Sequence, residues 1–206
     1  MESEIWNYKH MTKKQSDIFE AAKKLFYKFG VRRVTIEDIC EEANASKMTF
    51  YKYFPNKIEL VKAVVDNYFS NAIEKYREMI QSEITAEEKI RKTFELKLES
   101  AMGLEMDFLA DLYKYPDNVL KEHLNVWKQR SIDLTKSWFI EMQQNGLIIK
   151  ELNFPVFMLY ADAIQSFVLK DETMNFFGTT RELIHTVSRL LLYGITERKG
   201  KENPTE

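Results

Sequence analysis

The stretch that most constrains the fold is residues 35–54, TIEDICEEANASKMTFYKYF, which predicts two short helices joined by a tight turn. Thr35 is followed three residues later by Asp38, a pairing typical of helix starts. Asn44 interrupts the apolar periodicity, and Asn tolerates the left-handed backbone that a sharp turn demands. Ser46 is suited to cap the second helix. The stretch therefore predicts a helix-turn-helix.

The second of these helices has two different faces. Phe50 and Phe54 share one face, and small residues at Cys40, Ala43 and Ala45 allow the two helices to cross closely. The outer face is basic and aromatic, which suits the major groove of DNA. An ordinary helical hairpin inside an all-α protein explains the same pattern, so the flanking sequence has to separate the two interpretations.

The preceding segment predicts a third helix, from about residue 13 to a stop at Gly30. Because Phe50 and Phe54 need an apolar partner, we expect its apolar stripe to complete a small three-helix core. The first residues, 1–11, show no clear periodicity and are expected to be a mobile arm. The members of the stripe recur at helical spacing: Ile18, Ala22, Leu25, Phe26 and Phe29.

Charge is distributed unevenly along the chain. The formal net charge is −2, yet residues 9–57 hold eleven Lys or Arg against six Asp or Glu. A basic N-terminal part on an acidic body is typical of a DNA-binding domain followed by a second domain. A solvated surface would produce the same asymmetry, so the charge supports the DNA interpretation without establishing it.

The rest of the chain predicts further helices. Six Gly and four Pro in 206 residues leave few breaks, which favours an all-α fold of about nine helices. We expect a helix-turn-helix DNA-binding domain at 1–56, a helical ligand-binding and dimerisation domain at 57–198, and a disordered tail at 199–206. A single cysteine, no membrane-length apolar run and no signal peptide predict a cytoplasmic protein without membrane contact.

Residues 19–60, FEAAKKLFYKFGVRRVTIEDICEEANASKMTFYKYFPNKIEL, resemble the tetracycline-repressor-like (TetR) family of bacterial transcriptional regulators. The matching motifs are Phe-x-x-x-Gly, Thr-Ile-x-x-Ile, Ala-x-x-Ser-Lys and Phe-Tyr-x-Tyr-Phe-x-x-Lys, in that order. The family usually has Gly in the turn where this chain has Asn44, and it often has Gly in the recognition helix where this chain has Met48. The first departure is sterically acceptable, whereas the second places a bulky side chain at the groove. The resemblance implies a homodimer formed through the last two helices, because two heads read two half-sites; a monomeric core is the alternative.

The resemblance, supported by side-chain chemistry, assigns a DNA-binding role to eight residues. Lys47 opens the recognition helix and is expected to donate to guanine O6 and N7, while Met48 contacts a thymine methyl. Solvent exposure is the alternative for Lys52 and Lys57, and packing in the core is the alternative for Tyr53. The remaining six residues are expected to donate to phosphates, which fix the register of the protein on DNA: Thr35, Thr49, Tyr51, Lys52, Tyr53 and Lys57.

The body is rich in aromatic residues and Met, which fits either of two interpretations. One is a ligand cavity lined by apolar groups and a few polar ones, and the other is a filled helical core. The hydroxyl of Ser131 would orient a ligand or bond to a backbone carbonyl one turn back. The candidate ligand-binding residues are Met102, Phe108, Leu112, Trp127, Ser131, Leu134, Trp138 and Phe167.

No catalytic or metal-binding constellation is present in the sequence. His10, His123 and His185 lie far apart without metal-ligand spacing, and no Gly-rich phosphate loop occurs. We therefore expect neither an enzyme nor a bound metal or cofactor. The sequence predicts a repressor that leaves a palindromic operator when a small, largely apolar ligand binds, with the long helix from Lys57 transmitting the change. The alternative is a helical DNA-binding or interaction protein controlled by a protein partner without an inducer.

Overall fold

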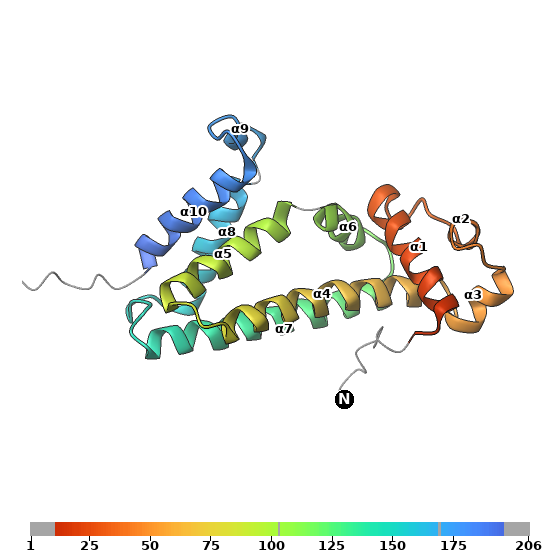
Figure 1. Ribbon diagram of the computed structural model, residues 1–206, viewed down its shortest axis with the longest axis horizontal. Helices are drawn as coiled ribbons and strands as arrows, with labels where there is room; N and C mark the ends of the chain where they lie inside the picture. The colour runs from red at the N-terminus through yellow and green to blue at the C-terminus, as the bar shows by residue number, and fades with distance from the viewer. Residues whose placement is uncertain (1–10, 103, 169, 196–206) are drawn as a thin grey trace, which may run out of the picture. The chain divides into compact units, whose positions relative to one another are not determined.

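The computed structural model describes residues 11–102, 104–168 and 170–195 (Figure 1). The all-α prediction is confirmed, with nine helices of seven or more residues in these ranges and a four-residue α9 that the sequence analysis did not include. The predicted tail and most of the predicted arm lie outside the described residues. The helices are α1 Lys13–Phe29, α2 Ile36–Glu42, α3 Lys47–Tyr53, α4 Lys57–Gln81, α5 Ala86–Met102, α6 Leu104–Tyr113, α7 Asn118–Gln144, α8 Phe154–Val168, α9 Asp171–Met174 and α10 Thr180–Ile195.

Contacts within the chain divide it into two compact units. The first unit comprises Met1–Arg77 and Gly103–Gln129, and the second comprises residues 78–102 and 130–206. Helices α4 and α7 therefore each contribute residues to both units. The functional division predicted at residue 56 follows the DNA-binding motif rather than these contacts, and it stays a prediction.

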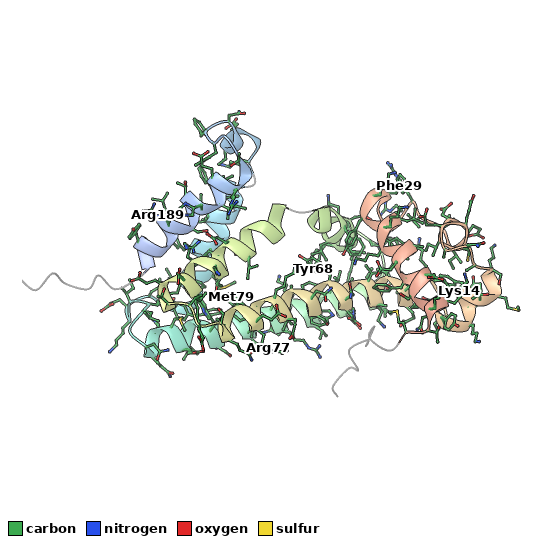
Figure 2. The ribbon with its side chains drawn as sticks, viewed as in Figure 1. Lys14, Phe29, Tyr68, Arg77, Met79 and Arg189 are labelled. Atoms are coloured by element: carbon green, nitrogen blue, oxygen red, sulfur yellow. The ribbon has the colours of Figure 1, made fainter. Side chains whose placement is uncertain are left out.

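Helices α1, α2 and α3 pack together in the first unit, as the red and orange ribbons of Figure 1 show. Phe26, Phe50 and Phe54 are buried together as expected. Phe29, which the periodicity placed on the same stripe, is 46% exposed instead (Figure 2). The small core is therefore closed at the end of α1 by Val31, which is fully buried.

Local hydrogen bonds set the ends of these helices as the sequence indicates. Thr35 and Asp38 form a reciprocal capping box at the start of α2. Asn44 takes the left-handed backbone with φ 45°, and Gly30 ends α1 with φ 77°. The hydroxyl of Ser46 accepts the Thr49 N–H at 3.1 Å and so caps α3. These bonds satisfy helix-end groups that would otherwise lack a partner, and they fix the angle between α2 and α3.

A buried carboxylate ties α4 to α7 within the first unit. Asp66 is 5% exposed, and its Oδ1 accepts the Trp127 indole N–H at 2.7 Å. Nε2 of His123 lies 2.6 Å from the same oxygen, and the Phe69 ring stacks on Trp127 at a centroid distance of 5.3 Å. Because a buried charge is costly without partners, these contacts specify how the two helices pair.

The second unit is built around aromatic side chains from α5, α7 and α8. Trp138 packs against Phe94 and Phe157, with ring centroids 6.4 and 6.1 Å away. Phe139 continues the cluster, 5.0 Å from Phe157. Helix α10 contacts both α5 and α8, and its Leu183 is buried. This cluster is the aromatic interior that the composition predicts.

Candidate nucleic-acid interface

The outer face of α3 is the exposed surface of the helix-turn-helix. Phe50 and Phe54 are 0% and 1% exposed, and their rings lie 6.0 Å apart beneath the helix. On the other side, Met48 is 82% exposed and Tyr51 is 53% exposed. Lys52 is also exposed. The buried aromatic pair therefore holds a short helix whose solvent-facing side is apolar, aromatic and basic, as a major-groove reader requires.

Lys47, at the first position of α3, is already paired. Its ammonium contacts the carboxylate of Glu37 in the first turn of α2, and both side chains are more than half exposed. The hydrogen bond from Lys47 lowers the pKa of Glu37, and the same bond raises the pKa of Lys47. The residue predicted to donate to guanine thus has a protein partner that competes for its charge.

Lys57 is half-buried and contacts backbone carbonyls of the first unit. Its ammonium donates to the carbonyls of Val31 and Val34, both at 2.9 Å, and lies 5.9 Å from the centroid of the Tyr115 ring. Burial lowers the pKa of Lys57. Both acceptors are in the segment between α1 and α2, so the proposed phosphate donor is at the same time a clamp on that segment.

The hydroxyls of Thr35 and Thr49 are occupied by local bonds. Thr35 Oγ1 donates to Asp38 at 2.7 Å, and the two oxygens of Ser46 and Thr49 lie 2.8 Å apart. Tyr53 is half-buried and lies under the Lys52 ammonium at 5.6 Å. The structure therefore brings Met48, Tyr51 and Lys52 to one exposed face. The polar groups of Thr35, Lys47, Thr49 and Lys57 have partners within the protein, and Tyr53 is half-buried.

Three further charged residues hold the helix-turn-helix, and the sequence analysis did not single them out. Lys14 donates to the Asn44 carbonyl at 2.9 Å, and Lys24 pairs with Glu42 at 2.6 Å. Asp111 of α6 accepts the Val31 N–H at 2.9 Å. Local periodicity contains no signal for these contacts, because the partners are 18 to 80 residues apart.

The predicted ligand-binding residues are divided between the two units. Phe108, Leu112 and Trp127 are buried in the core of the first unit. Trp138 is buried in the second unit, and its indole N–H has no hydrogen-bond partner among the residues that the structure describes. The remaining positions vary: Ser131 and Leu134 are half-buried, Phe167 is 46% exposed, and the side chain of Met102 lies outside the described residues. A single cavity lined by all eight stays a prediction.

Two searches over the described residues bear on other kinds of site. No group of three or more His, Cys, Asp or Glu side chains in residues 11–102, 104–168 and 170–195 is arranged to hold a metal ion. None of the helices within the same ranges is long and apolar enough to cross a membrane.

Comparison with known proteins points to the same N-terminal region. The family model described as bacterial regulatory proteins, tetR family, matches residues 18–64. The HTH-type transcriptional regulator TtgR of Pseudomonas putida is 45% identical over 53 residues, which are 26% of this chain and 25% of that protein. The chain thus spans a quarter of the length of that relative. The family is one of regulatory proteins, which supports the expectation of a regulator rather than an enzyme.

Two longer matches extend beyond the helix-turn-helix. The HTH-type transcriptional regulator YvaF of Bacillus subtilis (strain 168) is 25% identical over 171 residues, covering 79% of this chain and 85% of that protein. The crystal structure of the transcriptional regulator FadR from Bacillus subtilis in complex with stearoyl-CoA superposes with a TM-score of 0.68 at 20% identity, covering 87% and 98% of the two chains. The second match shows a common fold for both parts of the chain.

Proposed function

We propose that this chain, which belongs to the tetR family of bacterial regulatory proteins, works as a homodimeric transcriptional repressor. Its two recognition helices would occupy major-groove sites about one helical turn apart on a palindromic operator. A small, largely apolar ligand would bind the body and reduce the occupancy of that operator. The single observation that carries the proposal is the exposed face of α3.

That face combines groups for both kinds of DNA contact. Met48, at 82% exposure, offers an apolar contact to a thymine methyl. Tyr51 and Lys52 offer a hydroxyl and an ammonium to phosphates. Exposure of an apolar side chain of this size to water is unfavourable. Burial of the side chain in the groove would remove this cost.

The dimer is supported by the outer sides of α8 and α10. Phe157 and Leu183, from the stripes that the sequence assigned to a subunit interface, are buried within the subunit. A different set of apolar side chains is exposed on the same two helices, and a second copy would cover it. This set comprises Val156, Leu159, Tyr160, Phe167, Leu190 and Tyr193.

The ligand is supported by the aromatic cluster of the second unit. Trp138 has an indole N–H without an acceptor in the described part of the chain, and a buried donor without a partner is rare in folded proteins. An apolar ligand with one acceptor oxygen would satisfy it. The FadR structure of the same fold holds stearoyl-CoA, a ligand with a long apolar chain. A ligand that favours the off-state about 100-fold would shift the equilibrium by roughly 2.7 kcal/mol.

DNA binding is tested with duplexes selected by the protein from a randomised pool and measured by fluorescence anisotropy. We expect enrichment of a sequence with two-fold symmetry, and an affinity that falls steeply as salt rises. Sedimentation should give a dimer at the same concentrations. Failure of a folded protein to bind any duplex in dilute salt would refute the proposal.

The alternative, control by a protein partner without an inducer, makes a different prediction. Under the main proposal, an apolar ligand raises the melting temperature and releases the selected duplex, since it binds one state better than the other. Under the alternative, no apolar compound in a thermal-shift screen stabilises the protein, and the duplex stays bound until a protein is added.

A further inference from the structure

Glu37 stands where a negative charge is unexpected on a DNA-binding surface. It occupies the first turn of α2, and its carboxylate contacts Lys47 at the first position of α3. Both side chains are more than half exposed, so burial does not require the pair. The carboxylate is stabilised by the N-terminal end of α2, whereas a lysine at the start of α3 is disfavoured by the dipole of its own helix. The ion pair with Glu37 offsets the unfavourable interaction between Lys47 and the dipole of α3.

The pair changes what Lys47 can do on DNA. A free ammonium at the groove would approach phosphates of any sequence, because phosphate contacts carry no sequence information. With Glu37 attached, one of its three donors is occupied and its charge is neutralised locally. Two donors remain, which is the number that guanine O6 and N7 accept. A guanine at the right position therefore binds Lys47 without displacing Glu37, whereas loose phosphate contacts must compete with the carboxylate.

We propose that Glu37 is a specificity-determining residue, which weakens the binding of the helix-turn-helix to non-operator DNA by holding the Lys47 ammonium. The inference rests on the proposed DNA-binding function. Glu37 acts through Lys47, because it positions the ammonium that is proposed to donate to guanine. Its carboxylate also repels phosphates, and this penalty applies to every duplex, whereas the gain from a positioned lysine applies only where guanine is present.

The same helix offers a matched control. Glu41 lies one turn further along α2, is exposed, and forms no ion pair with any residue in the described part of the chain. Glu37→Gln and Glu41→Gln remove the same charge from the same helix. Only the first releases Lys47, so the difference between the two variants measures the effect of the pair rather than of net charge.

The experiment compares affinities for two probes. One is a mixed-sequence duplex of about three helical turns, and the other is the duplex that wild-type protein enriches from a random pool. Relative to Glu41→Gln, we expect Glu37→Gln to bind the mixed-sequence duplex about two- to fivefold more tightly per head. Its salt slope should be steeper by about 0.9 per head. Affinity for the selected duplex should change less, so the specificity ratio falls.

A double-mutant cycle with Lys47→Gln isolates the pair. In that background, Glu37→Gln should behave as Glu41→Gln does, since the released group is gone. The inference is overturned if the two glutamate variants match on both probes, or if the difference between Glu37→Gln and Glu41→Gln stays the same in the Lys47→Gln background. Circular dichroism melting of each variant checks that α2 stays folded. A wild-type protein that binds neither probe would instead overturn the proposed function, and this inference with it.

Discussion

Replacing Lys57 with methionine separates the carbonyl clamp seen in the structure from the phosphate contact that the sequence predicts. Methionine keeps an apolar stem of similar length but removes the ammonium, which donates to the carbonyls of Val31 and Val34 at 2.9 Å. If the ammonium mainly clamps this segment, the variant loses stability. If it mainly binds phosphate, the variant stays stable and loses salt-dependent DNA affinity.

The expected magnitude follows from these contacts. Hydrogen bonds from a charged donor contribute about 1.5–3 kcal/mol each. Two effects oppose them: Lys57 lies at the first position of α4, where a cation costs about 0.3–1 kcal/mol, and its half-buried ammonium has lost part of its hydration. We expect a net loss of about 2 kcal/mol for Lys57→Met. For a chain of this length, that lowers Tm by about 4–8 °C.

The assay is thermal unfolding by circular dichroism at one protein concentration, because Tm of a dimer depends on concentration. Lys52→Met is the matched control, since Lys52 is an exposed lysine on α3. We expect its Tm to change little and its DNA salt slope to fall by about 0.9 per head. A Lys57→Met protein with unchanged Tm and a shallower salt slope would refute the clamp and favour the phosphate contact.

Further substitutions test the packing and the helix ends of the two units. Asp66→Ala removes the buried acceptor of an indole N–H, and we expect a loss of about 2–4 kcal/mol in urea unfolding; Asp66→Asn should lose less, because its amide oxygen still accepts. Gly30 has φ 77°, and a Cβ added there would lie 3.0 Å from Asp111 Oδ2. Gly146 has φ 67°, and a Cβ added there would have no heavy atom of the described residues within 4 Å. We expect both alanine substitutions to lose about 1–2 kcal/mol from the backbone, with Gly30→Ala losing more. Trp138→Phe leaves a cavity, which costs stability, but it also removes a buried indole N–H that has no acceptor among the described residues. We therefore expect a smaller loss than for Trp127→Phe, whose indole N–H donates to Asp66; an equal or larger loss for Trp138→Phe would contradict the unpartnered donor.

The sequence predicted those features that depend on neighbouring residues. The capping box of Thr35 with Asp38, the Ser46 cap and the left-handed Asn44 each involve bonds or torsions within a few residues. Helix existence follows from periodicity for the same reason. Contacts that join distant segments were not predictable. The bond from Val31 to Asp111 spans 80 residues, and only the packed fold determines that the two meet.

The faces of α8 show a second reason why part of the structure could not be predicted from the sequence. This helix is apolar on most of its circumference, so helical spacing fits more than one stripe. The sequence selected the stripe that contains Phe157, which is buried within the subunit. The neighbouring Leu159 and Tyr160 are exposed instead. Periodicity identifies an apolar face, but it does not say whether the same chain or a second copy covers it.

The internal bonds of the helix-turn-helix also change what its basic composition means for DNA binding. Lys52 lies over the Tyr53 ring and Lys57 donates to neutral carbonyls, so their charges still attract DNA at long range. Lys24 and Lys47 are paired with carboxylates, so their charges are largely cancelled. Long-range steering depends on the summed field, whereas the salt slope depends on phosphates neutralised in contact. Removing either Lys24 or Lys52 changes the summed field by one charge, so the association rate should be about equally sensitive to the two lysines. The salt slope should respond more to Lys52 than to Lys24, and the slope of the wild-type protein should be shallower than a count of its lysines implies.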